Sequence, residues 1–153
     1  MPESEFDRKA VLGVLNRILE AELAGVVRYT HYSFMIYGYT RIPIVSWLRE
    51  QALENLTHAH AAGEHITHLG EHPSLAIGPL LETHKHDIGD ILREALDHER
   101  QGVTLYKELL RLVEGKSIYL EEYAREMAAA EEMHIGEVDK MLRKPGVVGV
   151  SGA

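Results

Sequence analysis

The sequence predicts an all-α protein that folds as a single four-helix bundle with one long crossover between the second and third helices. Apolar residues recur three or four residues apart through four long stretches, which is the spacing of one helix face. Short turns at residues 38–43 and 115–117 should make the helices on either side of each turn antiparallel. The remaining connection, residues 71–85, is long enough to cross from one end of a bundle to the other, which would place the second and third helices parallel.

The first predicted helix begins between residues 5 and 9 and ends at about Tyr37. Glu22 lies within its apolar face, where an ionised carboxylate is costly unless a cation or a hydrogen-bond donor compensates it. Considered alone, Glu22 is more simply explained as a charge at the edge of that face. Tyr29, two turns later on the same face, is either a donor to a buried carboxylate or ordinary aromatic core. The predicted buried face comprises Val11, Val14, Leu15, Ile18, Leu19, Val26, Tyr29 and Phe34.

The second predicted helix runs from about Pro43 to Leu69 and ends before Gly70, a residue that suits the position just past a helix end. Glu54 and His58 interrupt its apolar face one turn apart, so they stack on the same side of the helix. Most other histidines between residues 60 and 86 are expected at the surface, since a lone histidine on a helix is rarely a metal ligand. The predicted buried face comprises Ile44, Trp47, Leu48, Ala61, Ile66 and Leu69.

The crossover at residues 71–85 contains Pro73 and Gly78-Pro79, which cannot continue a helix. Four apolar residues should pack this segment against the bundle, namely Leu75, Ile77, Leu80 and Leu81. The third predicted helix follows from about His86 to Glu114 and carries Glu99 in its buried row. That row comprises Ile88, Ile91, Leu92, Ala95, Val103, Tyr106, Leu110 and Val113.

The fourth predicted helix starts after a Ser117 cap and ends at about Lys144. Glu131 and His134 stand three residues apart within its apolar stripe, so they project from one face and can bind a single metal ion from consecutive turns. The stripe comprises Leu120, Ala124, Met127, Ala128, Ile135, Val138, Met141 and Leu142.

Composition narrows the class of protein. The 153 residues suffice for one domain, expected at residues 1–146, followed by a loosely ordered tail at residues 147–153. The formal net charge of −8 disfavours a nucleic-acid partner and is compatible with attracting cations. Because the chain has no cysteine, metal ligands must be His, Asp or Glu. The sequence shows neither a signal-peptide pattern nor an apolar run long enough to span a bilayer, so we expect a cytoplasmic protein with no membrane partner.

The polar breaks in the four apolar faces should meet at one height near the middle of the bundle, because each helix pair folds back about its short turn. The candidate metal ligands are Glu22, Glu54, His58, Glu99, Glu131 and His134. Four carboxylates that converge in a dry core would repel one another unless cations compensate them, and two divalent ions are the simplest explanation. The order Glu, Glu with His, Glu, Glu with His is that of di-iron and di-manganese carboxylate bundles.

Two motifs are similar to those of a known family: Leu15-Asn16-Arg17 with Glu22-Leu23 and Tyr29 in the first helix, and Glu131-Glu132-Met133-His134 in the fourth. Over about Leu15 to Leu142 the chain resembles the ferritin-like di-metal proteins, most closely the bacterioferritin branch. The resemblance implies terminal ligands at Glu22 and Glu99, bridging ligands at Glu54 and Glu131, and one nitrogen ligand per ion from His58 and His134.

The activity that the resemblance implies is ferroxidase. Fe(II) would bind at the four carboxylates, which are also the implied catalytic residues, and oxygen or hydrogen peroxide would take its electrons. Ferric iron would then be handed on or mineralised, for storage or detoxification. Two iron ions are the expected metal content, with manganese as the alternative, and a homo-oligomer of at least two subunits is the expected assembly.

Three features depart from the bacterioferritin pattern. Glu54 and His58 are four residues apart rather than three, so Asn55 stands at the usual glutamate position. Either Asn55 replaces the bridging carboxylate, or an irregularity such as a π-bulge brings Glu54 inward. Leu56 stands where the haem-ligating methionine would follow, so no haem is expected. Too little chain follows His134 for the fifth helix used in cage assembly, which makes a dimer or a smaller shell an alternative to the large cage.

Two other functions stay open at this stage. The same site could serve a dimanganese catalase-like, peroxide-consuming or oxygen-activating enzyme, although the absence of cysteine excludes a rubrerythrin-type electron relay within the chain. A non-enzymatic helical bundle that binds a partner is the second alternative, and it would leave the buried carboxylates unexplained.

Overall fold

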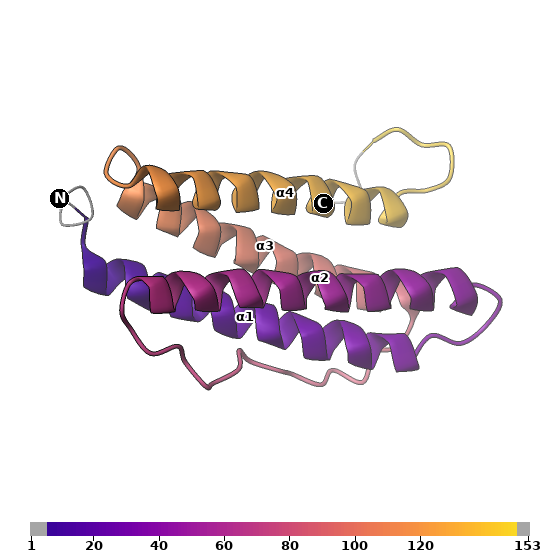
Figure 1. The fold of residues 1–153 in the computed structure, drawn as a ribbon. Coiled ribbons are helices and arrows are strands. Elements are labelled where there is room, and N and C mark those ends of the chain that lie inside the picture. The colour runs from indigo at the N-terminus through magenta and orange to yellow at the C-terminus, as the bar shows by residue number, and fades with distance from the viewer. Residues whose placement is uncertain (1–5, 150–153) are drawn as a thin grey trace.

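Four long helices form the protein, as the computed structural model shows for residues 6–149 (Figure 1). They are α1 (Arg8–Phe34), α2 (Arg41–His68), α3 (Ile88–Val113) and α4 (Ile118–Leu142). The described residues contain no strand, which confirms the all-α prediction. Each boundary lies within one helical turn of the one predicted, and no helix in this part of the chain is long and apolar enough to cross a membrane.

Local capping sets where three of the helices begin. The side chains of Asp7, Asp87 and Ser117 each accept a hydrogen bond from a backbone N–H in the first turn of α1, α3 and α4. The predicted Ser117 cap is therefore confirmed. Gly70 directly follows the C-terminal cap of α2 with a φ of 83°, a left-handed conformation that favours glycine.

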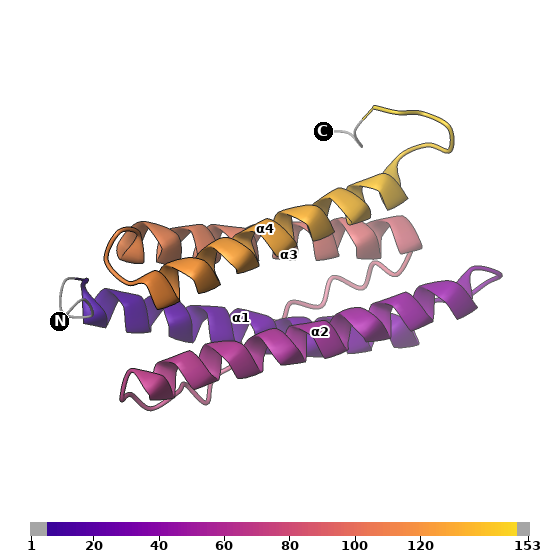
Figure 2. The ribbon, with the colours of Figure 1, turned by 45° about the horizontal axis from the view of Figure 1, so that its top comes forward.

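The helices form two antiparallel pairs, α1 with α2 and α3 with α4, and the crossover runs along the outside of α1 from one end of the bundle to the other (Figures 1 and 2). This route places α2 and α3 parallel, as predicted. Backbone and polar contacts hold the crossover on α1. The Gly78 N–H donates to the Glu20 carbonyl at 2.9 Å, and Arg28 donates to the Pro79 carbonyl at 2.6 Å.

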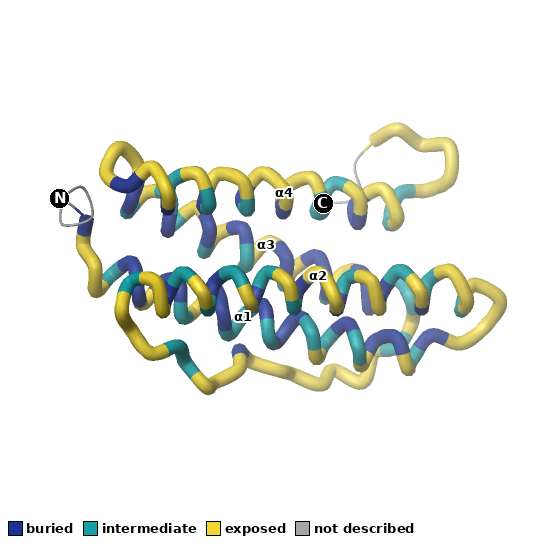
Figure 3. Tube along the Cα trace, in the orientation of Figure 1, coloured by how far each residue is buried: buried dark blue, intermediate teal, exposed yellow. Residues whose placement is uncertain are grey.

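The apolar side chains of the crossover do not pack it, contrary to the prediction. Leu75 is 96% exposed and Leu81 is 76% exposed. Hydrogen bonds, among them those from Gly78 and Arg28, join the crossover to α1 instead, and the segment is mostly exposed along its length (Figure 3). Phe34, predicted to be buried, is also exposed, because the helical rotation turns Ser33 inward instead. Met141, near the end of α4, is likewise exposed rather than buried.

Three apolar clusters fill the described part of the bundle, a large one toward one end and two toward the other, of which the smaller comprises Leu92, Leu96 and Val138. The first ends at Leu19 on α1 and Ala59 on α2, and the second begins at Tyr29 on α1 and Ala52 on α2. A layer of buried polar side chains separates them near mid-bundle. Of the predicted tail, residues 150–153 lie outside the described part of the chain.

Candidate metal centre

Four polar side chains, one from each helix, are buried in the layer between the apolar clusters. They are Glu22 on α1, Asn55 on α2, Glu99 on α3 and Glu131 on α4, each no more than 8% exposed. Two imidazoles, His58 on α2 and His134 on α4, complete the group. Helical periodicity explains their convergence, because each residue continues the inward row of its own helix.

The first half of the centre is built around His58. Its Nδ1 lies 3.3 Å from Glu22 Oε2 and 3.4 Å from Glu131 Oε1. The three ligand atoms all lie within 4.8 Å of one another. Since a metal ion with bonds of about 2.0–2.2 Å separates its ligands by about 3–4 Å, these three side chains could hold one ion after small movements.

The second half contains Glu99 and His134. Glu99 Oε1 lies 3.8 Å from His134 Nε2, and the imidazole stacks on the indole of Trp47 with the two ring planes 13° apart. Glu131 contacts His58 in the first half, and its carboxylate also helps to raise the pKa of Glu99, so Glu131 lies between the two halves. The centre therefore has one imidazole on each side and a shared glutamate in the middle.

Phenol and amide donors orient the carboxylates. The Tyr29 hydroxyl donates to Glu99 Oε1 at 2.7 Å, and the Tyr106 hydroxyl donates to Glu22 Oε1 at 3.1 Å. Asn55 Nδ2 donates to Glu22 Oε2 at 3.0 Å. Of the two roles that the sequence left open for Tyr29, the structure has the carboxylate donor. Tyr106 was predicted only as core, and nothing in the spacing of its helix distinguishes a donor from an aromatic core residue.

The structure brings five of the six predicted ligands together and leaves Glu54 outside. α2 is a regular α-helix throughout, with no π-bulge, so Asn55 points inward and Glu54 lies 100° further around the helix. The Glu54 side chain is 54% exposed and faces His58 Nε2 at 3.8 Å, on the opposite side of the ring from Glu22 and Glu131. Of the two arrangements left open by the sequence, the structure has the one in which Asn55 takes the inward position.

Gly25 makes room for Asn55. A Cβ atom at Gly25 would lie 2.4 Å from Asn55 Nδ2 and 2.8 Å from its Cγ, which is closer than non-bonded atoms approach. The close contact of α1 with α2 at this point therefore depends on glycine. A glycine inside an otherwise apolar helix face was the one signal in the sequence that could have pointed to it.

Burial and neighbouring carboxylates shift the pKa values of several side chains in the centre. Burial alone would lower the pKa of His58, but the Glu131 and Glu22 carboxylates outweigh it and raise that pKa to about 10. Burial and the neighbouring Glu131 carboxylate raise the pKa of Glu99 above its ordinary value. Burial also raises the pKa of Tyr29 and of Tyr106, so both phenols keep the protons that they donate.

The donor set fits divalent cations. His58 Nδ1 and His134 Nε2 are both buried and have no hydrogen-bond partner among the described residues. A buried polar nitrogen left unpaired costs free energy, and a metal ion would accept the lone pair of a neutral imidazole. Three carboxylates with two imidazoles form a hard, mixed oxygen and nitrogen set that suits iron or manganese.

Comparisons with known proteins identify the family and the fold. The sequence model of the family described as "Ferritin: Ferritin-like domain" matches residues 12–145. A structure of ferritin-like, diiron-carboxylate proteins from Bacillus anthracis str. Ames superposes with a TM-score of 0.83 at 21% identity, covering 88% of this chain and 96% of that one.

Two further solved structures share the fold. A dodecameric thioferritin, the bacterioferritin-related protein from Bacteroides fragilis, has a TM-score of 0.81 at 21% identity, covering 92% of this chain and 89% of that one. Rhodobacter capsulatus bacterioferritin, with a metal-free dinuclear site and haem iron, has a TM-score of 0.78 at 21% identity, covering 88% of this chain and 84% of that one. A search of curated protein sequences gives no match. Since the family match spans most of the chain and the fold is the same, the protein belongs to the ferritin-like domain family.

Proposed function

We propose that this protein is a ferroxidase that binds two Fe(II) ions per chain at the mid-bundle centre and oxidises them, for iron storage or detoxification. The observation that carries the proposal is the buried cluster itself, in which two unpartnered imidazole nitrogens face three buried carboxylates. Without cations, protons on His58 and Glu99 have to offset the repulsion between the carboxylates in this low-dielectric layer.

The proposed ligands divide between two ions. Glu22 and His58 would hold one ion, Glu99 and His134 would hold the other, and Glu131 would lie between them. Asn55 would replace the fourth carboxylate of the familiar pattern, either through its amide oxygen or by fixing Glu22 through its N–H. Glu54 faces the second ring nitrogen of His58, where a carboxylate orients an imidazole ligand.

In the proposed reaction, dioxygen or hydrogen peroxide accepts the electrons that Fe(II) loses. Each Fe(II) loses one electron, and dioxygen accepts two electrons and two protons to form hydrogen peroxide. Hydrogen peroxide as oxidant would accept two electrons and two protons to form water. His58 and Glu99 hold protons in the metal-free centre, and these protons leave their side chains when Fe(II) takes their place. The resulting ferric iron passes on to storage or release.

The test is the rate of Fe(II) oxidation in air by the purified full-length protein. Glu131→Ala removes the carboxylate shared by both halves and should lower the initial rate by at least about 100-fold. Glu132→Ala is the matched control, because Glu132 is the adjacent exposed residue, paired with Lys107, and should leave the rate unchanged. Wild-type rates in Glu131→Ala would contradict the proposal. Vigorous oxygen evolution from peroxide by the manganese-loaded protein, with slow Fe(II) oxidation, would favour the catalase-like alternative.

A further inference from the structure

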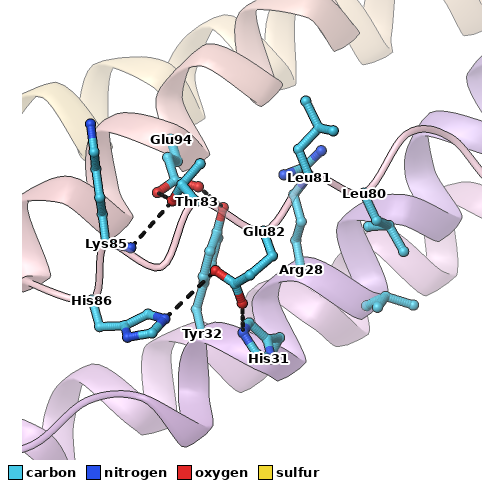
Figure 4. Close-up of a pocket in the computed structure, with 11 residues that line it drawn as sticks. Arg28, His31, Tyr32, Leu80, Leu81, Glu82, Thr83, Lys85, His86 and Glu94 are labelled. Atoms are coloured by element: carbon cyan, nitrogen blue, oxygen red, sulfur yellow. Dashed lines mark hydrogen bonds and ion pairs between the residues drawn. The ribbon is translucent and has the colours of Figure 1, made fainter.

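A second cluster of metal-binding side chains lies outside the mid-bundle centre, where the crossover passes over α1 (Figure 4). It comprises His31 on α1, Glu82 on the crossover and His86 just before α3. His31 Nε2 lies 2.9 Å from Glu82 Oε2, and His86 Nε2 lies 3.7 Å from Glu82 Oε1. One ligand atom from each residue falls within 4.8 Å of the other two.

The backbone around Glu82 is fixed by hydrogen bonds. The His84 N–H donates to Glu82 Oε1 at 2.6 Å, and this contact, with His31, lowers the pKa of the carboxyl group. The neighbouring Thr83 hydroxyl donates to Glu94 Oε2 on α3 at 2.7 Å. Glu82 is therefore an ionised acceptor, with His84 N–H at one carboxylate oxygen and His31 at the other, and it lies between the two imidazoles (Figure 4).

An unsatisfied nitrogen distinguishes this cluster from an ordinary surface ion pair. His86 Nε2 is buried and makes no hydrogen bond within the described residues, although Glu82 lies near it. An ion pair between half-exposed side chains contributes little and does not explain why a second imidazole is brought to the same carboxylate. A cation shared by the three side chains would satisfy all of them.

We propose that His31, Glu82 and His86 form a second metal site, which binds a divalent transition-metal ion and clamps the crossover onto α1. Two imidazoles and one carboxylate select ions such as Zn²⁺, Co²⁺ or Fe(II) over Mg²⁺ and Ca²⁺, which prefer oxygen ligands alone. The ligands are half exposed, so water completes the coordination sphere. The Lys85 side chain, which would repel an ion, extends away from His86 (Figure 4).

The site joins α1 to the segment that leads into α3, so an ion there would act on the structure. The crossover contacts α1 through hydrogen bonds at Ser74, Gly78 and Pro79, and its apolar side chains are exposed. A metal bridge from Glu82 and His86 to His31 would add a further attachment nearer to α3. The expected consequence is slower local opening of residues 80–87 when the ion is bound.

The first experiment counts Zn²⁺ ions bound per chain by calorimetry. His31→Ala and His86→Ala should each lose one bound ion, or bind it at least about tenfold more weakly, while His72→Ala on the same crossover should bind Zn²⁺ like the wild type. The same loss should occur in a Glu131→Ala background, which separates this site from the mid-bundle centre. His86→Gln keeps a polar side chain and should show the same loss, while circular dichroism reports folding.

The second experiment measures hydrogen–deuterium exchange of residues 80–87 with and without Zn²⁺. The wild type and His72→Ala should exchange more slowly with Zn²⁺, and His86→Ala should show no change. Unchanged Zn²⁺ stoichiometry and affinity in both His31→Ala and His86→Ala would overturn the proposal. An equal loss in His72→Ala would also overturn it. Iron oxidation at the mid-bundle centre does not enter either readout, so the two proposals fail independently.

Discussion

Asn55 is the residue that gives this centre its unusual charge. It occupies the inward position on α2, where it donates to Glu22, so three carboxylates rather than four face the proposed ions. With two divalent cations bound, one negative charge fewer leaves the centre more positive and should weaken its hold on the second ion. The amide also removes one source of repulsion from the metal-free protein, in which the pKa of Glu99 is already raised above its ordinary value.

Replacing Asn55 by Asp tests this account without changing the size of the side chain. The Asp carboxylate cannot donate to Glu22 and adds a charge, so the metal-free protein should lose about 1–3 kcal/mol of unfolding free energy. Binding of Mn²⁺ should tighten by about tenfold, because a fourth carboxylate faces the ions. Urea unfolding with and without Mn²⁺ measures both effects. A variant destabilised equally in both conditions, with unchanged Mn²⁺ affinity, would show that Asn55 is only a packing residue.

The raised pKa of His58 predicts that the affinity of the centre for metal ions depends on pH. Burial opposes its charge, but Glu131 and Glu22 raise its pKa to about 10, so the metal-free protein holds a proton there at neutral pH. A metal ion requires the unprotonated nitrogen, so binding releases this proton and the affinity for Mn²⁺ should rise as the pH increases from 6 to 9. Calorimetry in buffers of different ionisation enthalpy counts the protons released.

The test variant for this prediction and its matched control lie on the same helix. His58→Ala should release about one proton fewer per chain on Mn²⁺ binding, whereas His60→Ala, which alters an exposed histidine, should leave the count unchanged. An affinity independent of pH in the wild type would mean that His58 does not give up a proton to the ion.

At the scale of elements, the contact of α1 with α2 positions one half of the centre. The helix faces could be predicted from the sequence because burial follows the helical period, and that period found Glu22, Glu99 and Glu131. It could not decide between Glu54 and Asn55, since adjacent residues differ by only 100° of rotation. The deciding contact is between helices, where Gly25 leaves space for the Asn55 amide.

Two other features of the structure could not be predicted from the sequence, for the same physical reason. Tyr106 donates to Glu22 from another helix, so no spacing within α3 reveals its role. The cluster of His31, Glu82 and His86 joins segments about 50 residues apart through a crossover whose path depends on hydrogen bonds to α1. Periodicity locates positions on one helix, whereas these contacts depend on how elements meet.

Replacing Gly25 by Ala should separate α1 from α2 at the centre. The new methyl group would overlap the Asn55 amide, so either Asn55 leaves Glu22 or the helices move, at a cost of about 1–3 kcal/mol in unfolding free energy. Gly63→Ala is the control, because a Cβ there meets nothing within 4 Å and helix propensity should stabilise the protein by about 0.5–1 kcal/mol. Urea unfolding of both variants gives the comparison, and equal effects from the two substitutions would contradict the account.

At the scale of the whole molecule, the bundle places a polar layer between the apolar clusters at its two ends, and the crossover is mostly exposed to solvent (Figure 3). The net charge of −8 favours the approach of cations to such a molecule. Among proteins of the same fold, the one from Bacteroides fragilis is dodecameric. Light scattering of the purified protein would give the subunit number.

Anomalous diffraction from crystals loaded anaerobically with Fe(II), recorded at the iron absorption edge, is the most direct test of a dinuclear iron centre. Two iron peaks are expected in the mid-bundle layer, one next to Glu22 and His58 and the other next to Glu99 and His134, with Glu131 between them. A single peak, or no iron in that layer, would contradict a dinuclear iron centre in this protein.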